Sequence, residues 1–111
     1  MGEPSVTSEI ASRGYACGRV IHILSPLAPS DQLQPQSIVM AERTAPWLIA
    51  YLLDAAGLVL IRGGVLSHAA AMCRELDIPC LVGIDESFAA RLPNTVVELN
   101  ANQGYLRILG T

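Results

Sequence analysis

One histidine stands where a glycine pair meets the expected start of a helix. Gly63 and Gly64 precede Ser67 and His68, and a helix is expected over 69–76. Glycines let backbone amides approach a ligand closely, and serine is a favourable N-cap. Unpaired N–H groups and the helix dipole favour a negative group here, and a neutral imidazole is a nucleophile. The pattern indicates a histidine that takes up a phosphoryl group, although these residues equally allow one that is only hydrogen-bonded at a helix start.

Three arginines lie close enough in sequence to reach the same anion. Arg62 immediately precedes the glycine pair, and Arg43 precedes a short turn that contains Thr44. Arg74 lies six residues after His68, on the far side of the helix, so its long side chain either turns back towards a phosphate or pairs with a surface acid. Guanidinium groups suit such a role because their planar fork matches the oxygens of phosphate.

Composition excludes several classes of protein. The 111 residues are enough for one domain, 51% of them are hydrophobic, and the net charge is −3. Such an acidic chain without a basic run is a poor nucleic-acid binder, and the absence of lysine excludes both a Walker A loop and Schiff-base chemistry. No apolar run approaches the roughly 20 residues that span a bilayer, and no secretory signal opens the chain. We therefore expect a soluble, cytoplasmic protein that binds neither nucleic acid nor membrane.

The cysteines point to no metal site and no disulfide framework. Cys17, Cys73 and Cys80 are odd in number and form no C-x-x-C pair. Free thiols fit a reducing compartment, and each is expected to be a small core or surface residue.

Periodicity and turn signals predict a compact α/β domain after a flexible N-terminal tail over 1–11. The 25–36 segment, rich in proline, is expected to be a surface loop. Trp47, Tyr51 and Ala55 share a helix face that is expected to pack in the core, and His22 is expected to face solvent from a strand. The expected strands are 19–24, 38–40, 58–61, 80–82, 95–99 and 105–109, the last two as a hairpin, and the expected helices are 46–56, 69–76 and 86–92.

The segment from Gly63 to Gly83 resembles the phosphohistidine signature of the mobile, swivelling domain of PEP-utilising enzymes, as in phosphoenolpyruvate synthase, pyruvate phosphate dikinase and rifampin phosphotransferase. The flanking segments 12–20, 43–47 and 96–109 are similar to that family as well, so the resemblance covers about 12–111. The matching residues of the signature are Gly63-Gly64, Ser67-His68-Ala69-Ala70, Arg74-Glu75-Leu76, Ile78-Pro79 and Leu81-Val82-Gly83.

The resemblance implies a swivelling β/β/α domain over 12–111 and a carrier mechanism. His68 would be the catalytic residue that accepts a phosphoryl group at one active site and delivers it at another. Mg²⁺ and either ATP or phosphoenolpyruvate would be bound by nucleotide-binding and substrate-binding partner domains, with no cofactor on this domain, which is expected to be a monomer when isolated. The phosphate-binding residues would be Gly63, Gly64, Ser67, Ala69, Arg74, Arg43 and Thr44.

Some features depart from the family pattern, and alternative functions stay open. Leu66 stands where several members have threonine, Cys73 replaces a usual alanine, and Arg13 replaces a usual proline.

Members of the family carry this domain beside other domains, so the chain is either a fragment or a free-standing carrier. One alternative is a catalytically silent homologue that acts as a binding or scaffold module. Another is a small-molecule pocket beside Trp47, which only the aromatic residue supports.

Overall fold

The computed structural model describes residues 4–23 and 36–110, and its centre is a run of parallel strands that are buried on both faces. Strands β3, β4, β5 and β6 lie side by side in parallel, and antiparallel strands flank them. Within the described residues the strand order is β1-β8-β7-β3-β4-β5-β6-β2. The strands are β1 Ser5–Thr7, β2 Glu9–Ser12, β3 Tyr15–His22, β4 Ile38–Ala41, β5 Gly57–Leu60, β6 Cys80–Val82, β7 Val96–Asn100 and β8 Tyr105–Gly110.

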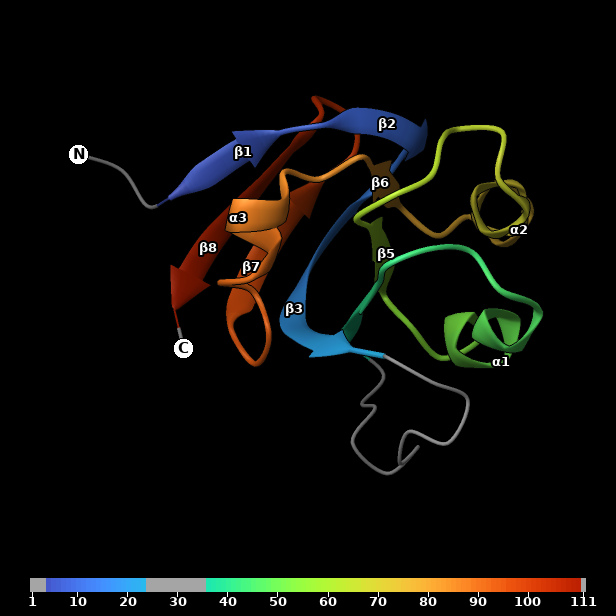
Figure 1. Cartoon of the computed structure of the whole chain (residues 1–111), viewed down its shortest axis with the longest axis horizontal. Helices are drawn as coiled ribbons and strands as arrows, with labels where there is room; N and C mark the ends of the chain where they lie inside the picture. The colour runs from blue at the N-terminus through green and yellow to red at the C-terminus, as the bar shows by residue number, and fades with distance from the viewer. Residues whose placement is uncertain (1–3, 24–35, 111) are drawn as a thin grey trace.

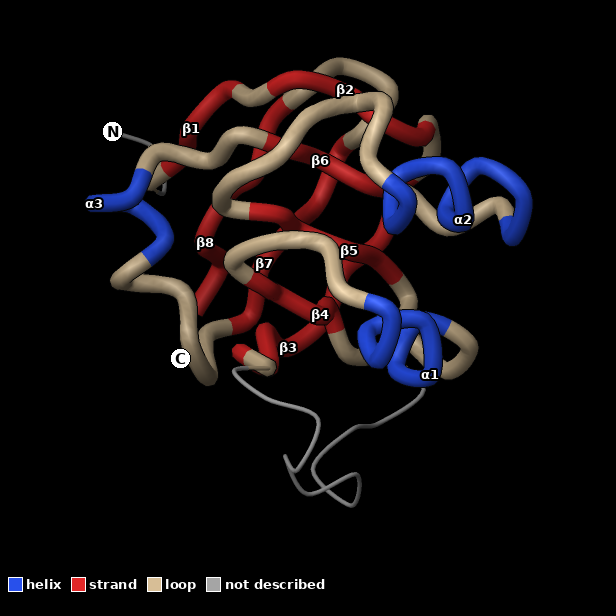
Figure 2. Tube along the Cα trace, turned by 45° about the vertical axis from the view of Figure 1, so that its right-hand side comes forward, coloured by secondary structure: helices blue, strands red, loops and turns tan. Residues whose placement is uncertain are grey.

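Short helices cover the two faces of this sheet. The helices α1 (Ile49–Leu52) and α2 (His68–Leu76) lie together on one side, and α3 (Glu86–Ala89) lies on the other (Figures 1 and 2). A short 3-10 turn, η2 (Pro46–Leu48), leads into α1. The mixed α/β architecture predicted from the sequence is confirmed.

Alternating side chains of the central strands fill two separate cores. In β5, Leu58 and Leu60 face the core under α1 and α2, whereas Val59 faces the core that α3 closes. All three side chains are completely buried. A strand that is apolar at every position is typical of a parallel sheet covered on both faces. The strand predicted over 58–61 is therefore confirmed, since β5 ends only one residue earlier.

Residues 5–12 join the two ends of the sheet, so the flexible tail predicted over 1–11 is wrong for residues 5–11. Strand β1 pairs with β8, and β2 pairs with β6 at the opposite end of the strand order. Only Ser8 separates β1 from β2, and its amide donates to the Gly104 carbonyl at 2.9 Å. The sheet thus closes on itself in the manner of a barrel. The sequence does not show this because edge residues paired by backbone bonds need no apolar periodicity.

Other element boundaries differ from expectation for local reasons. The helix predicted over 46–56 is shorter because the Ala56 amide donates to the Ser37 carbonyl at 2.9 Å and draws the chain back to the sheet. Strand β3 begins at Tyr15 rather than at 19. The predicted loop over 25–36 lies outside the described residues, apart from its last position. His22 is half-buried rather than facing solvent as predicted, and its Nε2 atom is buried with no hydrogen-bond partner among the described residues.

Candidate functional site

The start of α2 is formed by a serine cap, as the sequence predicts. Ser67 has extended backbone angles, and its hydroxyl accepts a hydrogen bond from the Ala70 amide at 3.3 Å. The Ser67 carbonyl accepts from the Ala71 amide at 3.0 Å and thereby begins the helical ladder. At the other end, Asp77 takes a left-handed conformation and its amide donates to the Cys73 carbonyl. His68 is therefore the first residue of a helix that is capped at both ends.

A second hydroxyl reaches the same helix start from a distant part of the chain. The Ala69 amide donates to Oγ1 of Thr44, which lies in the turn after β4, at 3.0 Å. Two of the first-turn amides, those of Ala69 and Ala70, are thus already bonded to hydroxyls. The sequence expectation that the Ala69 amide would bind phosphate stays a prediction, and the structure adds that Thr44 occupies this amide.

His68 is exposed and keeps its hydrogen-bonding capacity. Within 4–23 and 36–110, neither its imidazole nor its backbone amide has a hydrogen-bond partner. An anion beside the ring would therefore meet an unpaired N–H and the positive end of α2.

The two glycines before His68 have different structural requirements. Gly63 has a φ of +118°, a conformation that side chains rarely adopt, so the fold itself requires glycine there. Gly64 has no positive φ, and a Cβ on it would meet no atom within 4 Å. The fold does not demand glycine at position 64. A backbone left bare and exposed beside His68 is open to close approach by another molecule.

The three arginines divide into two that are engaged and one that is not. Arg74 turns back towards the start of α2 and donates from Nη1 to the carbonyls of Val65 and Ala11 rather than pairing with a surface acid, and its expected contact with phosphate stays a prediction. Arg62 pairs with the carboxylates of Glu42 and Glu86, and its pKa is raised chiefly by the hydrogen bond to Glu42. The guanidinium of Arg43 has no hydrogen bond or ion pair with any residue that the structure describes. Sequence reasoning missed Ala11, Glu42 and Glu86, and no motif signals them.

A hollow of about 260 Å³ lies beside the turn that contains Thr44. Arg43, Thr44 and Trp47 line it together with Glu42, and apolar side chains complete the wall. The edge of Trp47 meets Tyr51 with ring centroids 6.1 Å apart, which holds the indole against the core under α1, as the predicted packing face requires. The hollow therefore adjoins the helix start through Thr44, and it brings Arg43 to the same side of the molecule.

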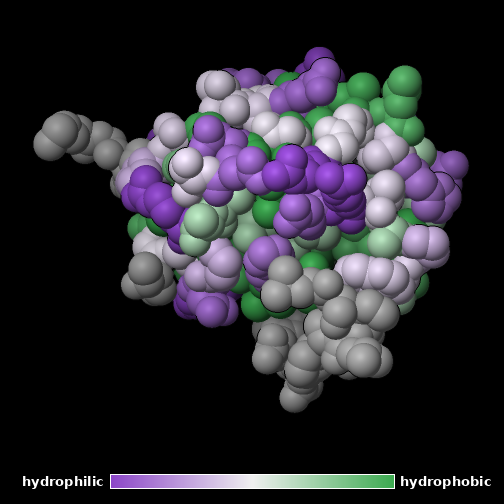
Figure 3. Space-filling model, in the orientation of Figure 1, coloured by the Kyte–Doolittle hydropathy of each residue, from purple (hydrophilic) through white to green (hydrophobic). Residues whose placement is uncertain are grey.

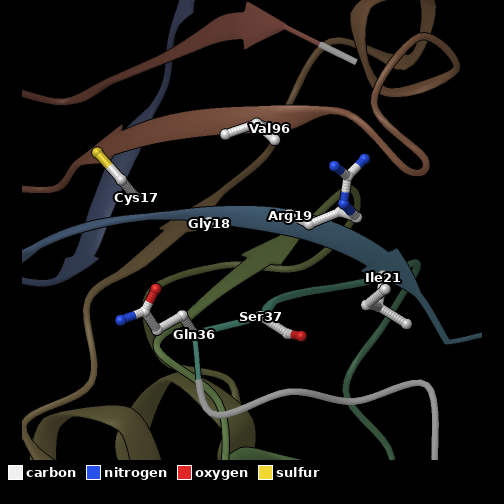
Figure 4. A pocket seen from close by; sticks show the side chains of 7 residues that line it. All are labelled: Cys17, Gly18, Arg19, Ile21, Gln36, Ser37 and Val96. Atoms are coloured by element: carbon white, nitrogen blue, oxygen red, sulfur yellow. The ribbon is translucent and has the colours of Figure 1, made fainter.

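A larger hollow of about 410 Å³ lies along β3, beside the residues that lead into β4 (Figure 4). Cys17 and Val96 line one side, and Gln36 and Ser37 line the other. The Arg19 guanidinium turns away from Gln36 and Ser37 in this view and donates to the Asn94 carbonyl. Because its polar side chains diverge, this hollow lacks the convergent groups that a polar ligand needs.

The cysteines and acids form no metal centre among the residues that the structure describes. Cys73 and Cys80 are buried and Cys17 is exposed, all as free thiols. The hydrogen bond between the Cys80 and Cys73 thiols, together with burial, raises the pKa of Cys80. A thiol held in its protonated form is a poor nucleophile. Cys80 is therefore unsuited to act as a nucleophile.

One polar cluster lies away from the helix start, on the sheet formed by β3, β7 and β8. The Tyr15 hydroxyl donates to Glu98 Oε2 at 2.6 Å, and Arg107 pairs with Oε1 of the same carboxylate. The hydrogen bond from Tyr15 and the charge of Arg107 lower the pKa of Glu98. Hydrogen bonds to Cys17 and Glu98 raise the pKa of the Tyr15 phenol. We call Tyr15, Glu98 and Arg107 the sheet network.

The surface around the helix start combines polar and apolar character. Figure 3 shows hydrophilic residues across the middle of the face seen in Figure 1, and a hydrophobic projection over the loop that leads to α2. In this loop Leu66 is 90% exposed. A single exposed leucine is ordinary on a protein surface, but this one lies two residues from His68.

Fold and site together define a class. A family model described as the PEP-utilising enzyme, mobile domain matches residues 33–104, which is well over half of the chain and includes Thr44, the glycine pair, His68 and Arg74. The chain therefore belongs to the family of PEP-utilising enzyme mobile domains.

Particular proteins agree with this assignment. The chain is 36% identical over 94 residues to a probable phosphoenolpyruvate synthase of Methanothermobacter thermautotrophicus, covering 85% of this chain and 14% of that protein. It is similar to the N-terminal domain of Enzyme 1 - Nitrogen, with a TM-score of 0.59, 25% identity, and coverage of 71% of this chain and 34% of that one. The fold alone is shared with aconitase X of Thermococcus kodakaraensis, with a TM-score of 0.65, 20% identity, and coverage of 96% and 98%.

The chain spans about one seventh of the length of the synthase and about a third of the Enzyme 1 chain. In the described part of the chain, no helix has the length and apolar character needed to cross a bilayer.

Proposed function

We propose that this chain is a phosphoryl carrier in which His68 holds the phosphoryl group. The observation that carries the proposal is the exposed His68 ring at the start of α2, with neither the ring nor its backbone amide bonded to a described residue. Membership of the PEP-utilising mobile domain family supports the same role. The exposed Gly64 and the capped but accessible helix start leave room for the group beside the ring.

The transfer step needs one nitrogen lone pair from neutral His68. This nitrogen attacks the phosphorus of the donor, the N–P bond forms, and the P–O bond to the leaving group breaks with its electron pair on the leaving oxygen. The proton on the other ring nitrogen then passes to solvent. The same sequence in reverse delivers the phosphoryl group to an acceptor. In-line positioning contributes more to such a reaction than covalent help from the domain.

The domain supplies only part of the electrostatic stabilisation. A helix N-terminus contributes about 0.3–2 kcal/mol to a bound anion, and Arg43 is the nearby arginine with no partner among the described residues. The larger share would come from partner domains that bind Mg²⁺ and either ATP or phosphoenolpyruvate, together with a substrate-binding domain. The greater length of the relatives supports such partners. Leu66, 90% exposed beside the site, is suited to contact a partner during transfer.

The experiment compares three forms of the chain, since it contains only two histidines. Wild type, His68→Ala and His22→Ala would be incubated with cell extract and either ATP or phosphoenolpyruvate, and then analysed by intact mass and peptide mapping at neutral pH. We expect an acid-labile phosphoryl group on wild type and on His22→Ala, and none on His68→Ala. The effective donor identifies the partner class. Labelling of His68→Ala equal to wild type would contradict the proposal, and no labelling of any form would favour the scaffold function.

A further inference from the structure

We infer that Arg74 is a positioning residue that fixes the loop before His68 to strand β2. The inference rests on the proposed function of His68, because it concerns how that histidine is presented to a partner. It assigns Arg74 a role different from direct phosphate binding. We call residues 63–67, between β5 and α2, the His68 loop.

A single nitrogen of Arg74 bridges two segments that are far apart in the sequence. Its Nη1 atom donates to the Val65 carbonyl at 2.8 Å and to the Ala11 carbonyl at 2.9 Å. Val65 lies in the middle of the His68 loop, and Ala11 lies in β2. Both N–H groups of this nitrogen are therefore used to hold the loop against the sheet.

The direction of the helix explains how a residue six positions after His68 reaches back beyond it. Helical side chains lean towards the N-terminus of their helix, and six residues span about 9 Å along the axis. An extended arginine covers most of that distance, and the bond to the Val65 carbonyl shows that the His68 loop runs back beside α2 to meet it. Arg74 in the last turn of α2 therefore reaches Val65, which precedes the helix.

The strand on the other side carries an irregularity at the position where Arg74 binds. In the pairing of β2 with β6, Ile10 faces Leu81 and Ser12 faces Cys80, so the register passes over Ala11. A bulge leaves its extra residue outside the ladder. The Ala11 carbonyl is thus available to the guanidinium, and bulges of this kind are common next to active sites.

The His68 loop has few other constraints. Its internal backbone bond runs from the Ser67 amide to the Gly64 carbonyl at 3.1 Å, and Gly63 and Gly64 are exposed. Charge-assisted hydrogen bonds are among the stronger polar contacts. Loss of the Arg74 bridge should therefore loosen the Ser67 cap and the direction in which His68 projects, without changing how exposed the ring is.

The first experiment measures the loop without any phosphoryl donor. Amide hydrogen exchange by NMR would be compared in wild type, Arg74→Met, Arg74→Lys and the control Arg13→Met, which removes a charge from an exposed arginine after β2. We expect the Ser67 amide to exchange about tenfold faster in Arg74→Met, near the wild-type rate in Arg13→Met, and at an intermediate rate in Arg74→Lys. Amides of the β7–β8 pair report on whether each variant is folded. Unchanged Ser67 exchange in folded Arg74→Met would overturn the inference.

The second experiment separates orientation from accessibility. Phosphoramidate, a small reagent that phosphorylates exposed histidine, should label His68 equally in wild type and Arg74→Met. Transfer from the protein-dependent donor should fall about tenfold in Arg74→Met and recover in part in Arg74→Lys. Slower protein-dependent transfer with unchanged Ser67 exchange would instead indicate direct phosphate contact and overturn the positioning role. If wild type accepts nothing from any donor, the proposed function fails, whereas the exchange result still decides whether Arg74 holds the loop.

Discussion

The start of α2 and the sheet network use polar groups in opposite ways. In the sheet network Glu98 is 8% exposed, and both of its oxygens are bonded, one to Tyr15 and one to Arg107. At the helix start, hydroxyls and Arg74 bond only to the backbone, and the His68 side chain stays exposed with no partner among the described residues. The sheet network bonds its ionisable side chains to one another, whereas the start of α2 leaves His68 and the neighbouring Arg43 without partners among the described residues.

The contrast between the sheet network and the start of α2 shows which of the two polar clusters is the better candidate for an active site. Mutual hydrogen bonds shift the pKa values of Tyr15 and Glu98 away from neutrality, so neither group changes charge easily near pH 7. A perturbed pKa is often taken as a sign of an active site, but structural networks shift pKa values as well. In this chain the better indicator of a candidate active site is His68, which has no partner among the described residues. Changes in the sheet network should affect stability, whereas changes at His68 should affect transfer.

The largest expected effect on stability comes from Gly18→Ala, in β3 beside the sheet network. A Cβ at Gly18 would lie 1.7 Å from the Gln36 carbonyl oxygen, so β3 and the start of β4 would have to separate. We expect destabilisation of about 3 kcal/mol, measured by urea denaturation.

The matched control is Gly64→Ala in the His68 loop, where an added Cβ meets nothing within 4 Å. It should change stability by less than about 0.5 kcal/mol. If Gly18→Ala and Gly64→Ala lowered the free energy of unfolding by similar amounts, the contrast between the two regions would be contradicted.

A smaller effect is expected for Glu98→Gln. This change weakens the bonds to Tyr15 and Arg107 and should cost about 1–2 kcal/mol at pH 7. Because the pKa of Glu98 is lower in the folded state, its contribution is present above the unfolded value of about 4.3 and is lost as pH falls through the folded value. Urea midpoints at several pH values would test this. The difference between wild type and variant should shrink on acidification, and a constant difference would show that ionised Glu98 is not responsible.

The smallest effect is expected for Thr44→Val at the helix start. The change keeps the shape of the side chain but removes the acceptor for the Ala69 amide, and should cost about 0.5–1 kcal/mol. Thr44→Ser retains the hydroxyl and serves as the control. Thermal denaturation would compare the two variants, and equal melting temperatures would mean that this hydrogen bond contributes nothing to stability.

Much of the fold and the helix start could be predicted because the signals are local. The Ser67 cap fixes the start of α2, and the apolar run of β5 requires cover on both faces. In contrast, β1 and β2 depend on pairing with β8 and β6, which no local pattern in residues 5–12 reveals.

The same limit applies to the site. A sequence shows that Arg74 and Arg62 are present near His68, but not what they bind. Arg74 bonds to two carbonyls and Arg62 to two carboxylates, and these partners lie up to 63 residues away. Backbone carbonyls carry no sequence signal at all. The position of His68 at the start of α2 was therefore predictable, whereas the groups that hold its surroundings were not.

The central claim is that His68 passes on what it receives. The most direct measurement is a chase: the chain is phosphorylated on His68, separated from the donor, and mixed with cell extract that has been freed of nucleotides and phosphoenolpyruvate. The account predicts that the phosphoryl group leaves His68 faster than it hydrolyses in buffer and appears in a small-molecule product. Retention on His68 at the rate of spontaneous hydrolysis, with the donor reaction intact, would contradict the carrier role.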